Sequence, residues 1–260
     1  MKRFIYNIKR YFKYAVYSAK ADLKAEVAGS YLNWLWWILD PLCFMMIYIF
    51  IASVIFKSSE PYFPVYIFIG LTTWDYFNKN INSSVKLVGN NRGIVTKIYI
   101  PKYILVLQKS FVNLFKMAIS WGLVFVLMII FGVPLSINFL YFIPILIVLY
   151  IVTFGFSLIL LHFGIFVEDL GNVTSLALRF VFYLSGIFYN INTKVPAPFN
   201  KLLVRLNPAA YIINAFRTIF LYGKVPSLIM LGGWFIVGCI ITMIGIHIIH
   251  KYENSYAKVI

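Results

Sequence analysis

The stretch Asp75–Lys102, DYFNKNINSSVKLVGNNRGIVTKIYIPK, decides how the rest of the chain is organised. It holds five basic side chains against one acid, five Asn, and a Gly-Asn-Asn-Arg-Gly turn from Gly89 to Gly93, and Pro101 marks its end. The sequence around it is strongly apolar. Because a membrane protein keeps such a polar segment out of lipid, we expect it to face the cytoplasm and to meet a soluble partner.

The overall composition is that of a membrane protein. Of the 260 residues, 62% are hydrophobic and only 12% are charged, about half the charged share of a soluble domain. Lipid must therefore solvate much of the chain. The net charge of +15 lies between apolar runs. This pattern favours a positive-inside membrane topology and contact with anionic headgroups, and it disfavours nucleic-acid binding.

The apolar runs predict six transmembrane helices. The first carries three Trp near its start and Asp40-Pro41 one to two turns inside, where an acid usually faces the protein interior. The six runs are Leu32–Phe56, a run that begins at Val65, Ile104–Phe131, Phe139–Val167, Val173–Ile191 and Leu228–Ile249.

Residues 1–30 predict a cytoplasmic amphipathic helix at the membrane interface. At about 100° per residue, the apolar side chains of residues 3–20 share one face and the basic side chains share the other. Such a helix lies flat on an anionic leaflet. The alternative is an ordinary amphipathic helix that packs on protein.

The region 196–223 predicts two short re-entrant helices, Phe199–Leu206 and Ala209–Leu221, on either side of Asn207-Pro208. Each is too short or too charged to cross a bilayer alone. The residues singled out here are Arg205, Asn207, Pro208 and Arg217. Anchoring to headgroups or to an anionic substrate would explain basic residues on the outer side.

The distribution of Lys and Arg sets the orientation. The N-terminal segment and Asp75–Lys102 are rich in both, whereas the turn between the third and fourth runs has neither. Both termini and the polar stretch are therefore expected in the cytoplasm. The predicted fold is an all-α membrane protein, with the interfacial helix in 1–30 and six spans plus the re-entrant pair in 31–260.

Catalytic and metal-binding signatures are missing from the sequence. There is no G-x-x-x-x-G-K-[ST] loop for ATP, no G-x-S-x-G and no H-E-x-x-H. Cys43 and Cys239 lie in separate apolar runs, and His162 reads as a core residue. A protease-like pairing of Asp40 with Asp75 is disfavoured, because neither has Gly-rich packing sequence around it. We therefore predict no catalytic residue and no metal site.

Four motifs, in order along nearly the whole chain, resemble the permease subunit of polysaccharide-exporting ABC transporters, the type-2 exporters of O-antigen, capsule and wall teichoic acid. Two departures are Glu168, where the family usually has Arg, and Gly186, where Pro is common. The motifs are Gly29–Leu32 with Trp34, Trp36 and Asp40-Pro41; Gly70-Leu71 with Trp74, Phe77, Asn90-Asn91, Ile94-Val95, Lys97 and Tyr99–Pro101; Phe166–Asp169 with Ser185–Ile187; and Asn207-Pro208 with Phe216-Arg217.

The resemblance implies a multi-pass subunit of the bacterial inner (cytoplasmic) membrane that moves a lipid-linked polysaccharide and is not an enzyme. Its implied partners are a second copy of itself, membrane lipid and two copies of a separate ABC ATPase. That ATPase would bind ATP and Mg, leaving no cofactor in this chain. Segment 87–98 resembles the family's coupling helix, with Asn90, Asn91, Arg92, Gly93, Ile94 and Lys97 as the candidate contacts.

Aromatic side chains are candidates for a channel lining, because sugar rings pack their C–H faces on aromatic faces. The alternative role for each is a lipid-facing belt or core packing. Two other functions stay open: a drug or lipid exporter permease of the same broad fold, and a membrane-embedded enzyme of polymer assembly. The candidate channel residues are Trp37, Tyr48, Tyr183, Phe188 and Tyr189.

Overall fold

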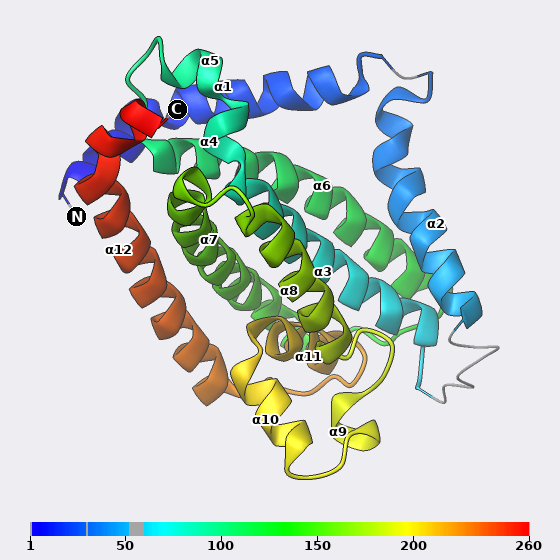
Figure 1. The fold of residues 1–260 in the computed structure, drawn as a ribbon. Coiled ribbons are helices and arrows are strands. Elements are labelled where there is room, and N and C mark those ends of the chain that lie inside the picture. Colours follow the sequence, from blue (N-terminus) through cyan, green and yellow to red (C-terminus); the bar gives the residue numbers. More distant parts are fainter. Residues whose placement is uncertain (1, 30, 52–59, 260) are drawn as a thin grey trace.

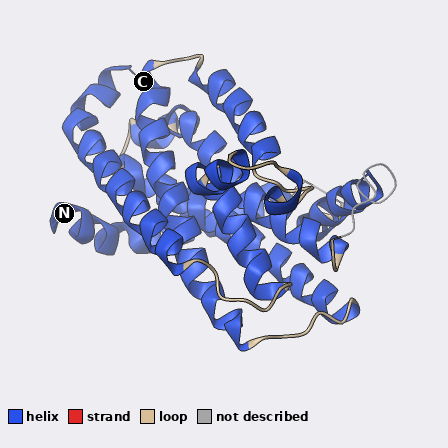
Figure 2. Ribbon diagram, turned by 90° about the horizontal axis from the view of Figure 1, so that it is seen from below, coloured by secondary structure: helices blue, strands red, loops and turns tan. Residues whose placement is uncertain are grey.

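The computed structural model describes residues 2–29, 31–51 and 60–259, and within these ranges the chain forms helices and loops with no strand (Figures 1 and 2). The all-α prediction is confirmed for this part of the chain. Among the described residues, three segments are long and apolar enough to cross a membrane: α6 (Lys102–Ile130), Ile137–Phe166, and the Leu228–Glu253 part of α12 (Leu228–Val259).

Two further apolar helices are shorter. The first is α2 (Trp36–Phe50), preceded by the 3-10 turn η1 (Asn33–Leu35), and the second is α8 (Leu170–Leu184). The first expected span reached Phe56, and its last residues lie outside the described ranges. The fifth was expected to run from Val173 to Ile191, but α8 begins earlier and ends at Leu184.

The central helix of the bundle is α7 (Phe142–Phe166), which follows the 3-10 turn η3 (Ile137–Tyr141). It packs between α12 and α3 (Phe63–Val85), and α6 packs on α3. Two glycines allow α7 to approach its neighbours. A Cβ on Gly164 would overlap the backbone of Val85 in α3, and one on Gly155 would lie 2.9 Å from Thr242 Oγ1 in α12. Close approach through small residues is typical of membrane helix pairs.

The polar stretch that opened the sequence is helical for much of its length. α3 continues past Trp74 to Val85, so the expected interruption begins about a dozen residues later than the hydropathy indicated. Polar side chains satisfy the helix locally: Lys79 pairs with Asp75 at 2.8 Å, and Asn80 Nδ2 donates to the Tyr76 carbonyl at 2.7 Å. Two one-turn helices follow, α4 (Leu87–Asn90) and α5 (Arg92–Val95).

The N-terminal helix α1 (Lys2–Val27) lies across the end of α6 (Figure 1). Its apolar face packs on protein: Ala15 is fully buried, and the Phe4 ring lies 5.1 Å from Tyr103. Asn7 Nδ2 donates to the Tyr103 hydroxyl at 2.8 Å. Most of the apolar face of α1 therefore covers α6. This arrangement fits the alternative interpretation, an amphipathic helix that packs on protein.

Three short helices lie at the opposite end of the bundle: α9 (Ile191–Lys194), α10 (Phe199–Leu206) and α11 (Pro208–Phe220) (Figure 1). Helices occupy both amphipathic pieces that the sequence singled out, but their surroundings differ. α10 has no buried residue, whereas most of α11 is buried against α3 and α7. Both chain termini lie at the other end, near α4 and α5 (Figure 1).

Buried apolar side chains form two clusters that correspond to these two ends. The larger cluster joins α3, α6, α7 and α11. Its aromatic rings Trp121, Phe216 and Phe220 meet Phe142 in edge-on and tilted contacts. The smaller cluster joins α1, α4, the start of α6, and the ends of α7 and α12.

Candidate functional site

A cavity of about 960 Å³ opens between α2, α3, α6 and α8. Its wall combines aromatic side chains with charged and amide side chains, an unusual mixture for the interior of a membrane protein. Charged groups at membrane depth are costly and usually mark a watery path. The aromatic and charged residues of the lining include Trp36, Trp37, Asp40, Trp74, Asp75, Lys79, Lys116, Arg179, Phe182 and Tyr183.

The aromatic part of the wall is held by ring contacts. Trp74 packs on Phe182 with 5.4 Å between centroids, and Trp37 packs edge-on against Phe115 at 5.5 Å. Tilted and edge-on contacts at these distances are the favourable arrangements for aromatic pairs. The rings are therefore fixed by neighbours while their free faces border the cavity.

The predicted channel residues separate into three groups. Trp37 and Tyr183 line the cavity. Phe188 and Tyr189 do not line it, but they contact residues that do: Phe188 packs on Phe182 at 5.4 Å, and the Tyr189 hydroxyl donates to the Tyr183 carbonyl at 2.9 Å. The side chain of Tyr48 lies outside the described residues.

Paired charges form the polar part of the wall. Asp75 and Lys79 pair at 2.8 Å within α3, and Lys116 of α6 pairs with Glu26 of α1 at 2.5 Å. All four side chains keep part of their surface exposed, which lowers the desolvation cost of holding charge there. Asp40 also borders the cavity, as expected for an acid inside an apolar run.

Arg217 occupies a completely different environment. Its side chain in α11 is buried, and its guanidinium donates to three backbone carbonyls (Tyr66, Gly186 and Ile187) at 2.7 to 3.1 Å. It also lies 3.4 Å from the centre of the Tyr66 ring. The planar guanidinium, with its five donors, suits this convergence of acceptors. We call Arg217 and these three carbonyls the Arg217 site.

Neighbouring residues make room for this arrangement and cap the helix. A Cβ on Gly70 would lie only 2.7 Å from Arg217 Nη2, so glycine is needed for the close approach. Asn207 Oδ1 accepts from the backbone N–H groups of Ala209 and Ala210 at 3.0 and 3.3 Å, and its Nδ2 donates to Ser185 Oγ at 3.0 Å. Asn207 is thus the N-cap of α11, and Pro208 follows at the first helical position.

Of the four re-entrant residues, Asn207, Pro208 and Arg217 lie together in the capped, buried α11, whereas Arg205 is exposed on α10. The Arg217 site brings together three stretches that the sequence noted separately, around Gly70, Ser185–Ile187 and Phe216-Arg217. Their order along the chain was visible in the sequence, but their convergence on one guanidinium was not.

Segment 87–98 forms a surface at the other end of the bundle. Leu87 and Val88 anchor it in the smaller core, and Asn91 Nδ2 donates to the Leu87 carbonyl at 2.8 Å. Beyond this anchor, Asn90, Arg92, Gly93, Ile94 and Lys97 are exposed. Ile98 is 58% exposed as well. We call Arg92, Ile94, Lys97 and Ile98 the basic–apolar surface.

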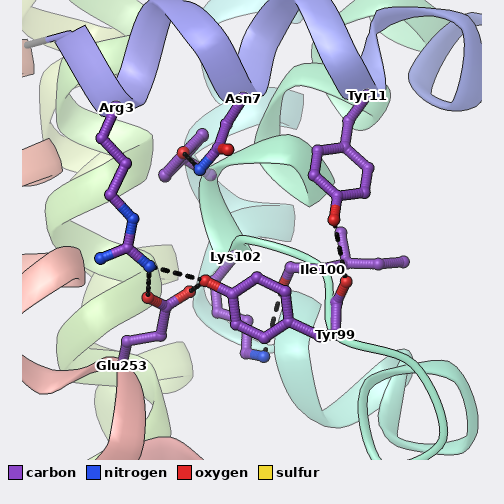
Figure 3. Close-up of polar contacts among 8 residues, drawn as sticks. Arg3, Asn7, Tyr11, Tyr99, Ile100, Lys102 and Glu253 are labelled. Carbon is purple, nitrogen blue, oxygen red and sulfur yellow. Dashed lines mark hydrogen bonds and ion pairs between the residues drawn. The ribbon is translucent and has the colours of Figure 1, made fainter.

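A polar cluster next to this surface ties distant parts of the chain together (Figure 3). Arg3 Nη2 lies 3.0 Å from the Glu253 carboxylate and donates to the Tyr99 hydroxyl at 2.8 Å, and that hydroxyl donates to Glu253 at 2.8 Å. Partial burial, with help from Glu253, raises the pKa of Tyr99, so its hydroxyl stays neutral. We call Arg3, Tyr99 and Glu253 the terminal cluster.

Comparison with known proteins identifies the family. The model of a family described as the ABC-2 type transporter matches residues 19–221, most of the chain. The chain belongs to the ABC-2 type transporter family. It is therefore a multi-pass membrane subunit of a transporter rather than an enzyme, and an ABC-2 subunit works with an ABC ATPase. The resemblance noted from the sequence motifs is confirmed.

Curated relatives of this ABC-2 subunit match it over most or nearly all of its length. Two proteins of Klebsiella pneumoniae named O-antigen export system permease protein RfbA are 26% and 27% identical to it over 98% of both chains. A Myxococcus xanthus protein of the same name is 24% identical over 87% of both chains. The Arg217 site, the cavity and the basic–apolar surface therefore lie in a chain of the same extent as these permeases.

Proposed function

We propose that this chain is the channel-forming subunit of an ABC exporter that moves a lipid-linked polysaccharide outward across the bacterial cytoplasmic membrane. The observation that carries the proposal is its similarity, over 98% of both chains, to two permeases named for O-antigen export. O-antigen is the favoured cargo for this reason. Capsular polysaccharide and teichoic acid are the alternatives within the same proposal.

The cavity supports a sugar polymer as cargo. Trp37, Trp74 and Tyr183 offer aromatic faces, and partly exposed charges keep water beside them. Sugar rings place C–H groups on aromatic faces and hydroxyl groups toward water, so a mixed wall contacts a glycan without one tight site. A polymer can slide only where no single contact holds it. In this proposal α2, α3 and α8 line the path.

The proposed topology has six crossings, by α2, α3, α6, α7, α8 and α12. The excess of Lys and Arg in α1 and around α4 and α5 supports a cytoplasmic location for that end and for both termini. α9, α10 and α11 then lie toward the outside. α8 is only about 22 Å long at 1.5 Å per residue, so residues 185–190 would complete its crossing next to the Arg217 site.

The proposed assembly contains two copies of this chain and two copies of an ABC ATPase. The ATPase binds ATP and Mg, and this chain binds neither. The basic–apolar surface is the proposed contact, because exposed isoleucines between cations suit a partner groove with an apolar floor and an acidic rim. A rigid-body movement of the ATPase would pass through α4 and α5 into α3 and α6.

The function is tested in the source bacterium by deleting the gene and restoring variants. Deletion should abolish surface glycan and leave its lipid-linked form inside the cell. The double variant Trp37→Ala/Tyr183→Ala should restore export poorly. Trp34→Ala/Tyr31→Ala is a matched control, because both of these residues are exposed and neither lines the cavity. Surface glycan measured by immunoblot decides the outcome, and normal levels in the deletion strain would refute the proposal.

The topology is tested with single cysteines in a chain whose Cys43 and Cys239 are replaced by Ser. Lys201→Cys and Arg205→Cys are exposed positions on α10 and should react with an impermeant maleimide in intact spheroplasts. Lys97→Cys should react only after the membrane is permeabilised. Labelling of position 97 from outside would overturn the proposed orientation.

A further inference from the structure

A second cavity of about 560 Å³ adjoins the first on the side of α4, and its lining consists of basic, amide and hydroxyl side chains and one glycine. The two cavities share lining residues, among them Lys79, Asn82 and Lys116. The remaining residues come from the end of α3, from α4 and its N-cap, from the first half of α6 and from the start of α8. They are Asn78, Ser83, Lys86, Asn90, Lys109, Asn113, Gly171, Asn172 and Ser175.

The charges around this cavity are not balanced. Lys79, Lys86, Lys109 and Lys116 line it, and no carboxylate does. Two of the four lysines have acidic partners, in Asp75 and Glu26. Within the part of the chain that the structure describes, Lys86 and Lys109 have none. Glu168 and Asp169 precede α8 but do not belong to the lining.

The start of α8 borders the cavity as well. Gly171 and Asn172 belong to its first turn, and the end of the Lys86 side chain lies against it: a Cβ on Gly171 would be 3.0 Å from Lys86 Cε and 3.7 Å from its Nζ. The N-terminus of a helix attracts anions and repels cations. The N-cap residue Asp169 makes no side-chain capping bond to the helix. The Lys86 ammonium and the backbone N–H groups of this first turn could both donate to an anion placed between them.

We propose that this second cavity binds the phosphate-bearing headgroup of a lipid from the inner leaflet. Lys86 and Lys109 would contact the phosphate oxygens, with Asn172 and the first turn of α8 as neutral donors. The lysines lie near the helix ends closest to α4, the depth at which headgroups meet protein in the proposed topology. Because the first cavity adjoins this one, a headgroup held here would present its attached chain to the aromatic wall.

This inference rests on the proposed function, since the lipid expected to matter is the carrier of the exported glycan. Phosphate is also present in bulk anionic phospholipid. The two sources share the same chemistry, so the experiment includes both. The probes are a fluorescent polyprenyl diphosphate, phosphatidylglycerol as competitor, and the corresponding polyprenol without phosphate.

The full chain is reconstituted in phosphatidylcholine nanodiscs, and probe binding is measured with wild type and Lys86→Gln/Lys109→Gln. We expect the double variant to bind the diphosphate probe at least about tenfold more weakly, because each lost lysine removes a charge-assisted contact. Lys194→Gln/Lys201→Gln is the control, since it removes the same charge from exposed positions outside the cavity. It should bind like wild type. The polyprenol should not bind in a lysine-dependent way.

Equal affinity of wild type and Lys86→Gln/Lys109→Gln would overturn the proposal, as would an equal loss in the control variant. Competition by phosphatidylglycerol at equal mole fraction would identify bulk phospholipid as the source, and lack of competition would identify the carrier. The single variants Lys86→Gln and Lys109→Gln replace the double variant if its thermal unfolding shows misfolding, and the same criteria apply to each.

The outcome is separable from that of the proposed function, because binding is measured without an ATPase and without transport. If probe binding in nanodiscs does not depend on the two lysines, while gene deletion abolishes surface glycan in cells, the phosphate site is refuted and the proposed function stands. Lysine-dependent binding with no effect of gene deletion on surface glycan would refute the function and keep the site.

Discussion

Two arginines hold the two ends of this molecule in opposite ways. Arg217 is 3% exposed and all of its hydrogen bonds go to backbone carbonyls, whereas the Arg3 side chain is 59% exposed and binds the side chains of Glu253 and Tyr99. Buried acceptors that lose their donor have no substitute, but exposed groups exchange protein for water at little cost. The end near α11 is thus held by buried hydrogen bonds that fix one arrangement. The end at the proposed ATPase contact is held by exposed hydrogen bonds that water can replace.

The largest effect is expected at the Arg217 site. Arg217→Met keeps the side-chain length but leaves the carbonyls of Tyr66, Gly186 and Ile187 without a donor, which should lower the free energy of unfolding by roughly 3–5 kcal/mol. Arg217→Lys should lose less, because an ammonium retains the charge but not the planar fork. Denaturant unfolding in detergent measures both. If the two variants were equally stable, the geometry of the guanidinium would not matter.

A smaller effect at the same end is expected from Gly70→Ala. The added methyl meets Arg217 Nη2, so the guanidinium must shift from its carbonyl partners, with an expected loss of about 1–3 kcal/mol. Gly122→Ala in α6 is the control, because a Cβ there meets nothing within 4 Å. It should change stability by less than about 1 kcal/mol. Similar unfolding curves for the two variants would show that the close approach at Gly70 is not required.

The terminal cluster should contribute much less. A double-mutant cycle with Arg3→Gln and Glu253→Gln should give a coupling free energy below about 1 kcal/mol that decreases further with added salt. Thermal unfolding at low and high salt provides the measurement. A coupling as large as the loss in Arg217→Met would remove the contrast between the two ends.

The smallest effect on stability is expected at the basic–apolar surface. Ile94→Ser/Ile98→Ser replaces exposed side chains and should change the free energy of unfolding by no more than about 0.5 kcal/mol. Co-purification with the ABC ATPase should nevertheless fall strongly. Ile137→Ser/Leu140→Ser, an exposed apolar pair at the other end, should leave co-purification unchanged. Intact association of the first variant would place the ATPase contact elsewhere.

Local patterns in the sequence were sufficient to predict the helices but not their surroundings. The apolar runs, the amphipathic face of α1 and the break at Asn207-Pro208 each correspond to a helix or a helix boundary. α10 and α11 read alike, as short amphipathic pieces with one or two cations. The difference between them depends on carbonyls far from Arg217 in the sequence. Ile187 and Gly186 are 30 and 31 residues away, and Tyr66 is 151 residues away.

For the polar stretch and the candidate site, too, local patterns in the sequence did not predict which side chains contact one another. Hydropathy placed an interruption after Trp74, but hydropathy does not register that Lys79 pairs with Asp75, or that Asn80 donates to the Tyr76 carbonyl, within one helix. Trp37 and Tyr183 were chosen for their residue type, and they line the cavity. Phe188 was chosen on the same ground and packs in the core. The contact between Arg3 and Glu253 joins residues 250 positions apart and leaves no local signal.

The Arg217 site has a consequence for biogenesis. Its acceptors come from the start of α3 and from the loop after α8, whereas its donor lies in α11, after most of the chain has been synthesised. The earlier helices must therefore enter the membrane before the carbonyls of Gly186 and Ile187 can accept hydrogen bonds from Arg217. The Arg217 site is completed only when α11 packs against α3 and the loop after α8, so a chain truncated before residue 217 should be recognised as unfinished and degraded.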